Sequence, residues 1–432
     1  MKKLIYISLL VLVSFSVAQS NDYYYPPSNQ DNWETVDRDK LGWNLDKLDT
    51  LEKFLAENNS KGFVILYKGR IALEFYFDDF NKDSLWYWAS AAKTLTTFLI
   101  GKAQEDGFLD IDDKTSDFLG EGWTSCTKEQ EDQIKIKNHI SMTCGLDDSG
   151  NKDCTDKECL VFKAEAGTRW AYHNAVNTLL HDILYSATGK TNNQLTYQYL
   201  TQTIGLKGLW FKSEYLNIFG STPRNMARFG HLILSGGDWD GEEVLNDKEY
   251  FNEMINTSQD INKSYGYMWW LNGKGSYMMP GLQFEFKTDL IPNAPDDLVS
   301  GLGKNDQKVY VVPSLDMVVV RMGDAADNVS AALSSFDNLL WGHLMELFDD
   351  FTSVEYHAGN LLIYPNPAGD FVRFSEDTEM KEIEIINNLG VAVIKQKHPG
   401  NQINISHLLP GVYFVKLLDI SGNYSIQKFI KN

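Results

Sequence analysis

The sequence predicts a mixed α/β fold of the α+β type, with an antiparallel sheet and helices on its faces, followed by a small all-β sandwich. Two patterns and one change in composition support this. Helix-like and strand-like segments alternate through residues 19–351 (the body), whereas residues 360–432 (the tail) contain only strand-like segments. All 11 tryptophans and all 4 cysteines precede residue 355. Such a break in composition indicates a boundary between two domains, with residues 352–359 as the linker.

Five helices are expected in the body, because apolar residues recur there at intervals of three and four. Asn44 is placed to cap the first helix. Thr222 and Pro223 open the fourth, since threonine favours the helix cap and proline the first turn. The expected helices cover residues 45–55, 90–105, 176–184, a segment beginning at 223, and residues 331–348.

Strands are expected on both sides of the helical middle of the body. Residues 62–77 read as two strands around a Lys68-Gly69 turn, and three later strands are expected at residues 265–271, 309–313 and 317–321. Strands at both ends with helices between them favour one antiparallel sheet covered by helices.

The tail has the pattern of short strands joined by turns. Residues 381–385 alternate between polar and apolar, residues 387–390 supply a turn, and residues 411–418 and 424–430 form a closing hairpin. Six or seven short strands in this length predict a small β-sandwich. A strand-rich carbohydrate-binding module is the alternative.

The charge excludes some partners. The 59 acidic and 39 basic side chains give a formal charge of −20, and the tail has seven of each, so the surplus lies before it. Because such a charge repels phosphate groups, binding to nucleic acid or to an anionic membrane surface is not expected.

The N-terminus has the features of a signal peptide. Lys2 and Lys3 precede an apolar stretch at residues 4–18, and Ser16-Val17-Ala18 offers a cleavage site. The alternative is an uncleaved anchor, but the stretch is short for a membrane span. No later segment is apolar enough to span, so the mature chain is expected to be exported, extracellular or at the outer cell surface.

The four cysteines lie within one segment of the body. In an oxidising compartment we expect two local disulfides, Cys154–Cys159 and Cys126–Cys144, out of three possible pairings. Cys-x2-Cys and His-Glu-x-x-His spacings do not occur. Neither a metal nor another cofactor is therefore expected.

A Ser-x-x-Lys pattern at Ser90 and Lys93 indicates a nucleophile with its base. A serine needs a base to remove its proton, and residues three apart on a helix share one face. A lysine acts as a base only when neutral, which burial favours. The pattern also occurs at Ser125, Ser149 and Ser425, but only Ser90 opens an apolar helix. The alternative is a helix-cap serine followed by a solvated lysine.

Tyr172 and Asn174 form a second candidate pair. Two residues apart in extended backbone, they point to one side, so a phenol and a carboxamide would face one cleft. A nearby ammonium favours the phenolate, which can accept or relay a proton. Tyr-x-Asn occurs four times, and an isolated copy is more simply a buried tyrosine beside a turn. Only this copy precedes an apolar helix.

Together these segments resemble the serine β-lactamase and penicillin-binding-protein superfamily, in its class C β-lactamase and esterase branch. The resemblance runs in matching order through residues 38–349, and residues 223–230 and 310–321 also carry it. It implies an antiparallel sheet between an all-helical subdomain and flanking helices. By resemblance, Ser90 is the nucleophile, Lys93 and Tyr172 share general acid and base work, and Asn174 positions the substrate.

The third motif of that superfamily, Lys-Thr-Gly or a histidine-containing variant, is missing. Ser300, Gly301, Leu302 and Gly303 stand at its place, with Lys304 displaced. Glycine lets backbone approach a substrate, so an N–H group of Gly301, Leu302 or Gly303, with that of Ser90, is expected to form the oxyanion hole. Loss of the lysine and hydroxyl that grip a carboxylate favours a substrate lacking one.

An aromatic run offers a wall for an acyl pocket, although such a run is more often core. Its candidate residues are Tyr267, Trp269 and Trp270.

The tail resembles the C-terminal sorting domain of the type IX secretion system. The resemblance is carried by residues 364–368, by residues 409–414 and by the basic end at residues 428–431. It implies the secretion machinery as a partner and passage across the outer membrane.

The sequence thus predicts a secreted serine hydrolase that forms an acyl-enzyme with a small ester or amide. Two alternatives stay open. One is a peptidoglycan D-Ala-D-Ala peptidase or a β-lactamase. The other is an inactive surface-binding protein that has kept the fold.

Overall fold

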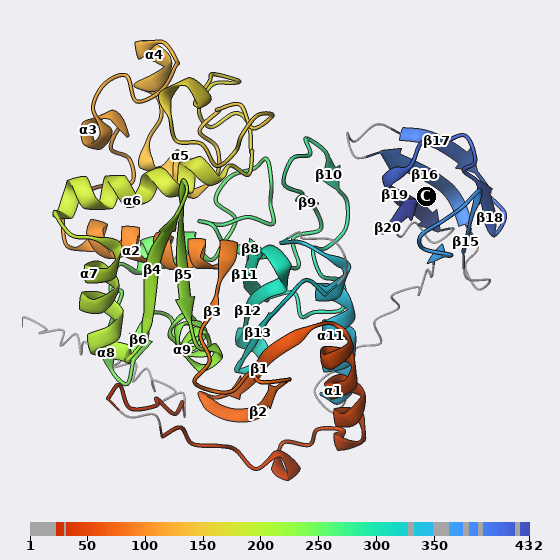
Figure 1. Cartoon of the computed structure of the whole chain (residues 1–432), viewed down its shortest axis with the longest axis horizontal. Helices are drawn as coiled ribbons and strands as arrows, with labels where there is room; N and C mark the ends of the chain where they lie inside the picture. Colours follow the sequence, from red (N-terminus) through yellow and green to blue (C-terminus); the bar gives the residue numbers. More distant parts are fainter. Residues whose placement is uncertain are drawn as a thin grey trace, which may run out of the picture.

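The computed structural model describes two folded parts, a large body and an all-β tail (Figure 1). The predicted signal peptide and the predicted linker lie outside the described residues. No helix within the described ranges is long and apolar enough to cross a membrane. The described residues are 23–29, 32–326, 332–348, 363–374, 380–387, 392–419 and 424–432.

The body is built on one six-stranded antiparallel sheet in the order β2-β1-β13-β12-β11-β8. In its centre, Val64 of β1 lies opposite Val320 of β13. Both side chains are fully buried, and the central strands read as continuous apolar runs because both faces of the sheet are covered. The strands are β1 (Ser60–Tyr67), β2 (Arg70–Tyr76), β8 (Trp270–Leu271), β11 (Val299–Gly303), β12 (Gln307–Val312) and β13 (Met317–Gly323).

Helices cover opposite faces of this sheet. On β12, Lys308 and Tyr310 both bond Asp337 of α11, whereas Val309 between them packs against Gly230 of α9. Because strand residues alternate between faces, α9 lies on one face and α11 on the other, with α1 beside α11 (Figure 1). These helices are α1 (Leu48–Glu57), α9 (Pro223–Leu234) and α11 (Ser335–Leu347).

The helical middle of the body packs around α2 (Lys93–Glu105), which contacts α6 (Asn174–Thr188). Residues 93–103 are all buried, so α2 is enclosed on every side. Short helices complete the body: η1 (Arg38–Lys40), η2 (Leu45–Lys47), η3 (Ala89–Ala92), α3 (Ser116–Leu119), α4 (Lys128–Glu131), α5 (Ile136–Ile140), η4 (Lys157–Cys159), α7 (Asn192–Thr196), η5 (Tyr197–Thr201), α8 (Gln202–Ile204), α10 (Lys248–Met254), η6 (Lys304–Asp306) and η7 (Pro313–Leu315).

Small sheets flank the main one. They comprise β3 (Trp86–Tyr87), β4 (Gly208–Ser213) and β5 (Leu216–Ser221); β6 (Asp238–Trp239) and β7 (Glu242–Glu243); and β9 (Tyr277–Met278) and β10 (Glu285–Phe286).

The expected signal at the start of α9 is confirmed. The helices expected at residues 176–184 and 331–348 begin at Asn174 and Ser335 instead. Thr222 caps α9 by accepting a hydrogen bond from the Asn225 N–H group, and Pro223 occupies its first turn. Asn44, in contrast, makes no capping bond, and a single 3-10 turn precedes α1. The helix expected from residue 90 likewise begins as the 3-10 turn η3.

The strand expected at residues 265–271 is largely wrong. Only Trp270–Leu271 forms a strand, because the backbone folds back one turn earlier. Met268 has a φ of 61°, and its N–H group donates to Gly266 O at 3.0 Å. A tight turn of this kind cannot belong to a strand.

The disulfide prediction is half correct. Cys154 and Cys159 are bonded, but Cys126 and Cys144 are free thiols, so the predicted second bridge is wrong. Cys144 is 5% exposed within the core of the body, where it packs as a small apolar residue, and burial raises the pKa of its thiol.

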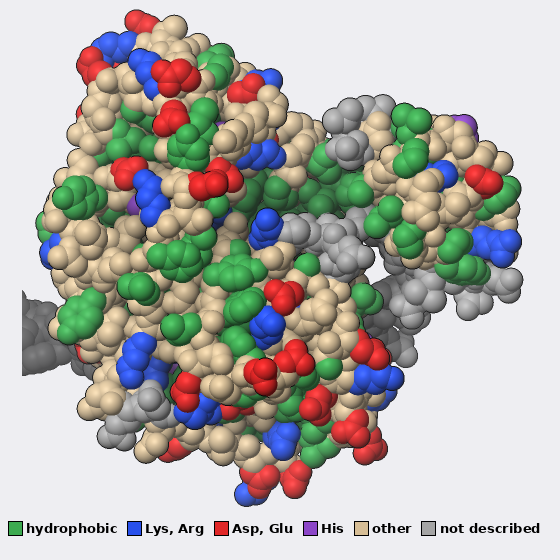
Figure 2. All heavy atoms as spheres, viewed as in Figure 1, with side chains coloured by type: hydrophobic (Ala, Val, Ile, Leu, Met, Phe, Trp, Pro, Cys, Tyr) green, Lys and Arg blue, Asp and Glu red, His purple; other side chains and the backbone are tan. Residues whose placement is uncertain are grey.

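The tail forms a sandwich of two antiparallel sheets around its own core, which Val372 and Phe374 share with Ile385 and Val415. The tail also contacts the body, because the ring of Phe286 in β10 meets the ring of Phe414 in β19 edge to face. Figure 2 shows hydrophobic side chains gathered between the two parts. The strands are β14 (Ile363–Tyr364), β15 (Phe371–Phe374), β16 (Met380–Asn387), β17 (Ala392–Lys397), β18 (Gln402–Asn404), β19 (Gly411–Asp419) and β20 (Tyr424–Lys431).

Candidate active site

Ser90 lies on a strained turn at the start of α2. Ala89 before it has a φ of 48°, a left-handed conformation that a residue with a Cβ adopts at a cost. The fully buried Trp88 anchors this turn, since its indole donates to Ser221 Oγ at 2.8 Å. Ser90 is only half-buried, so its hydroxyl remains within reach of a substrate.

Lys93 is the first residue of α2 and joins the two candidate motifs. Its Nζ lies 2.8 Å from Ser90 Oγ and 2.8 Å from Asn174 Oδ1, and 5.1 Å from the centroid of the Tyr172 ring. The side chain is 6% exposed. The structure therefore brings the four predicted residues together around one buried amine, although 81 positions separate Lys93 from Asn174.

The second motif reaches Lys93 through the start of α6. His173 is extended, with φ −128° and ψ 118°, so Tyr172 and Asn174 lie on the same side of the chain. His173 points the other way and is buried, and burial lowers its pKa. His173 therefore packs in the core and does not face the site.

Aromatic rings fix the position of Tyr172. Its ring stacks on Trp270 with 6.1 Å between centroids and meets Tyr265 edge to face at 6.3 Å. Among the described residues, no side chain or backbone group bonds its hydroxyl, although the side chain is 7% exposed. This hydroxyl is thus available to a substrate or a water.

A histidine on α6 also lies near Lys93. His181 lies on α6, and burial lowers its pKa to about 4, with the charge of Lys93 acting in the same direction. It is therefore neutral at pH 7.

The strand β11 packs directly on the turn that carries Ser90. A Cβ on Gly303 would lie 2.4 Å from Trp88 O and 3.1 Å from Ala91 N, and a Cβ on Gly301 would lie 3.3 Å from Ala91 O. β8 pairs only with Val299 and Ser300, so no strand in the described part of the chain pairs with this edge from Gly301 to Gly303. The side of β11 that faces Ser90 is thus bare backbone.

The two faces of β11 differ at the position of the missing third motif: glycine backbone lies on the face toward Ser90, and side chains lie on the other face. Leu302 lies opposite Lys308 of β12 and is buried away from Ser90. Lys308 is fully buried too, with its Nζ 3.1 Å from Asp306 and 2.9 Å from Asp337. Burial raises the pKa of Asp337. Burial is also the largest single influence on Asp306, but the charges of Lys308 and Arg321 and the hydrogen bonds from Ser334 and the Ala326 N–H group together outweigh it and lower the pKa.

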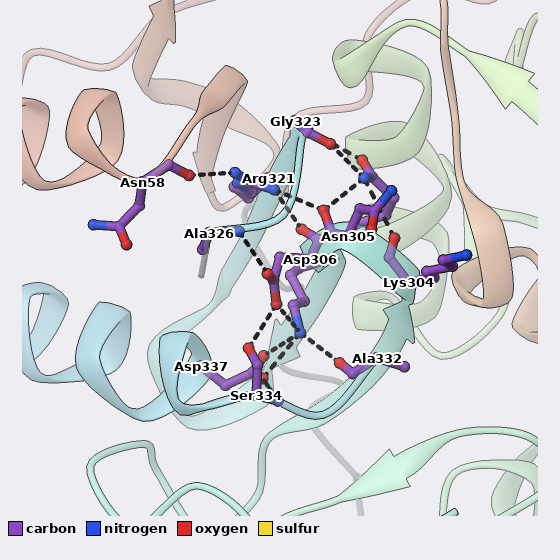
Figure 3. A network of polar contacts seen from close by, with 12 residues as sticks. Asn58, Lys304, Asn305, Asp306, Arg321, Gly323, Ala326, Ala332, Ser334 and Asp337 are labelled. Carbon is purple, nitrogen blue, oxygen red and sulfur yellow. Dashed lines mark hydrogen bonds and ion pairs between the residues drawn. The ribbon is translucent and has the colours of Figure 1, made fainter. Parts of the chain in front are cut away.

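The same network holds the turn that follows β11 (Figure 3). Arg321 donates to the carbonyl oxygens of Asn305 and Asp306, both of which have left-handed backbone. Lys304 is exposed, and its side chain points away from the network. The two lysines nearest the third-motif position thus take up a structural role or face solvent.

The predicted pocket wall is mostly core. Trp269 stacks on Phe229 under the sheet, and the Tyr267 hydroxyl donates to Glu253. Both side chains are almost fully buried. Only Trp270 touches the site, through Tyr172.

Sequence reasoning missed Asp153, whose Oδ1 accepts a hydrogen bond from Asn174 Nδ2 at 2.7 Å. It lies in a polar turn before Cys154, and no spacing relates it to residue 174. Only the fold places the two side by side.

Comparisons with known proteins agree with this geometry. The family model for β-lactamases matches residues 49–331, and the model for the secretion-system C-terminal sorting domain matches residues 362–432. No curated protein matches the chain.

Solved structures share the fold at low sequence identity. A penicillin-binding-protein homologue from Caulobacter crescentus has a TM-score of 0.55 at 12% identity, over 74% of this chain and 99% of its own. A family VIII carboxylesterase has a TM-score of 0.53 at 12% identity, over 74% and 99%. EstCE1, described as a hydrolase with promiscuous acyltransferase activity, has a TM-score of 0.51 at 12% identity, over 72% and 99%. At these identities the likeness extends to the fold alone.

Proposed function

Because the chain belongs to the β-lactamase family, we propose that it is a secreted serine hydrolase that acts on an ester or amide through an acyl-enzyme. The tail is a secretion-system sorting domain, which indicates export by the type IX system to the cell surface or beyond. The observation that carries the proposal is the position of Lys93 Nζ, 2.8 Å from both Ser90 Oγ and Asn174 Oδ1.

In the acylation step, Lys93 takes the proton of Ser90, and Oγ attacks the substrate carbonyl carbon. The carbonyl π electrons move to its oxygen, and the resulting oxyanion receives hydrogen bonds from the backbone N–H of Ser90 and from one on β11. When the tetrahedral intermediate collapses, the bond to the leaving group breaks, and Lys93 gives the proton to the leaving group, either directly or through the Tyr172 hydroxyl.

In the deacylation step, water attacks the acyl carbonyl carbon, and the Tyr172 hydroxyl accepts the proton of the water while it passes its own proton to Lys93. The bond between the acyl carbon and Ser90 Oγ then breaks, the acid leaves, and the proton returns to Oγ. The position of the Tyr172 ring, 5.1 Å from Lys93 Nζ, supports this role, because it puts the phenol in the same site as the amine that exchanges protons with Ser90. Asn174 accepts a hydrogen bond from Lys93, and its role is to position the substrate.

An uncharged substrate is favoured over one recognised through a carboxylate. The lysine and hydroxyl of the family's third motif are missing from residues 301–303, and both carboxylates that pair with Lys308 hold its ammonium inside the protein. Two of the structures that share the fold are a carboxylesterase and a hydrolase with acyltransferase activity.

The test is hydrolysis of p-nitrophenyl butyrate by the full chain and by S90A. We expect turnover to fall by at least roughly a thousandfold in S90A. The matched control is S149A, because Ser149 begins another Ser-x-x-Lys pattern in an exposed turn, and it should retain full turnover. Equal turnover by wild type and S90A refutes the proposal.

Two further measurements separate the alternatives. Stoichiometric labelling of Ser90 by a fluorescent penicillin, without ester turnover, would favour a β-lactamase or peptidase. No labelling of Ser90 by a fluorophosphonate, with saturable binding of a glycan or peptide, would favour an inactive binding protein.

A further inference from the structure

The carboxamide of Asn174 is held from both ends. Its Oδ1 accepts a hydrogen bond from Lys93 Nζ at 2.8 Å, and its Nδ2 donates to Asp153 Oδ1 at 2.7 Å. A carboxylate only accepts and the lysine N–H only donates, so both partners select the same orientation of the amide. Turned over, Asn174 would present NH2 to the amine and its carbonyl to the carboxylate, and both bonds would be lost.

The orientation of Asn174 bears directly on the base. A neutral lysine amine has two N–H groups and one lone pair. When an N–H is donated to Asn174 Oδ1, the lone pair is free to point at the Ser90 hydroxyl, 2.8 Å away. A contact that fixes the orientation of the Asn174 carboxamide therefore also directs the lone pair of Lys93 toward Ser90.

The loop that carries Asp153 is attached to the same helix end. The Lys152 carbonyl accepts a hydrogen bond from the N–H of Ala175, the second residue of α6, at 2.8 Å. Asp153 N donates to Asn151 Oδ1 at 3.1 Å, and the Cys154–Cys159 disulfide begins at the next residue. A carboxylate near the N-terminus of a 15-residue helix is also favoured by the helix dipole.

We propose that Asp153 is a positioning residue, which orients the Asn174 carboxamide toward Lys93, and that the Cys154–Cys159 loop keeps Asp153 in place. This inference rests on the proposed function, since it assigns a further role within the same site. Asp153 acts through Asn174 rather than on the substrate.

The first experiment compares single variants of the full chain on p-nitrophenyl butyrate. We expect D153A to lower kcat roughly ten- to a hundredfold with little change in KM, as expected for a residue that orients a group contacting the reaction. D153N should retain most of kcat, because its amide oxygen still accepts the Asn174 N–H. The control is D49A, since Asp49 is exposed on α1, which packs against α11. Its kcat should stay at the wild-type value.

The second experiment tests whether Asp153 acts through Asn174. N174A should lower kcat, and in that background D153A should cause no further loss. Reduction of the disulfide should lower kcat in the wild type and not in D153A. An additional loss in the double variant, or wild-type kcat in D153A, overturns the inference.

The two proposals fail in different ways. If wild type and S90A hydrolyse the ester equally, the proposed function fails. If turnover requires Ser90 but D153A retains it, only the role of Asp153 fails. The rate of Ser90 labelling by a fluorophosphonate gives the same comparison without dependence on the choice of ester.

Discussion

The contact between β11 and the turn of Ser90 makes Gly303→Ala a sharp test of the site. The new Cβ would lie 2.4 Å from Trp88 O, 3.1 Å from Ala91 N and 3.1 Å from the Gln307 Cβ. Ordinary contacts of a Cβ are 3.4–4 Å long. β11 and η3 must therefore separate by about 1 Å, since the atoms in the way belong to backbone.

The cost of this separation follows from the packing. The Gly303 backbone, with φ −120° and ψ 154°, suits alanine, so the substitution adds no backbone strain. Overpacking alone should lower the free energy of unfolding by about 1–3 kcal/mol. A shift of about 1 Å between nucleophile and oxyanion donors should lower kcat roughly a hundredfold.

The assay combines urea unfolding, followed by tryptophan fluorescence, with ester hydrolysis at 25 °C. The control is Gly150→Ala, because no atom lies within 4 Å of the Cβ that it would add and the backbone there is not left-handed. This control should match the wild type in both measurements. Wild-type kcat in G303A would refute the reasoning, since the approach of β11 to η3 would then be irrelevant to the reaction.

Two further predictions concern stability. Lys308→Met leaves the carboxylates of Asp306 and Asp337 buried without their shared ammonium, and should lower the free energy of unfolding by about 3–5 kcal/mol. The control is Lys53→Met, which removes an exposed ion pair and should lower it by less than about 1 kcal/mol. Equal thermal shifts for the two variants would contradict this. Burial lowers the pKa of three histidines to about 4, so below pH 6.5 the unfolded chain binds more protons than the folded chain. The free energy of unfolding should therefore fall as the pH drops from about 6.5 to 4. Between pH 7 and 5 the fall should be about 2 kcal/mol per histidine. Urea unfolding at both pH values measures this, and His139→Asn should remove one histidine's share; an unchanged pH dependence in that variant would contradict the assignment. The histidines are His139, His181 and His231.

Local patterns predicted the elements that depend on neighbours in the sequence. The spacing of Ser90 and Lys93 on one turn, and of Tyr172 and Asn174 along one extended segment, requires only backbone geometry. The antiparallel sheet and the β-sandwich were likewise predicted from the spacing at which apolar residues recur along the chain.

Contacts set by the fold were not predictable in this way. The distance between Lys93 and Asn174 depends on how α2 packs on α6, and the bond from Asn174 to Asp153 depends on a loop without any spacing signal. Aromatic composition suggested a strand through Met268, but a left-handed turn interrupts it. A run of aromatic residues indicates that the segment is buried, and here its side chains are buried in the core although most of the segment does not form a strand.

The close approach of β11 also explains why the missing lysine is not replaced on that strand. At Gly301, a Cβ would already lie 2.9 Å from Val309 Cγ1 and 3.1 Å from Thr94 Cγ2, so a longer side chain does not fit on the face toward Ser90. The next side chain, Leu302, points to the opposite face of the sheet, where Lys308 is neutralised by Asp306 and Asp337. A strand that packs as backbone against the nucleophile offers N–H groups to an oxyanion and offers no charge to a carboxylate. In the proposed reaction, other walls of the site would therefore recognise the acyl group, and one of these walls is the stacked ring pair of Tyr172 and Trp270.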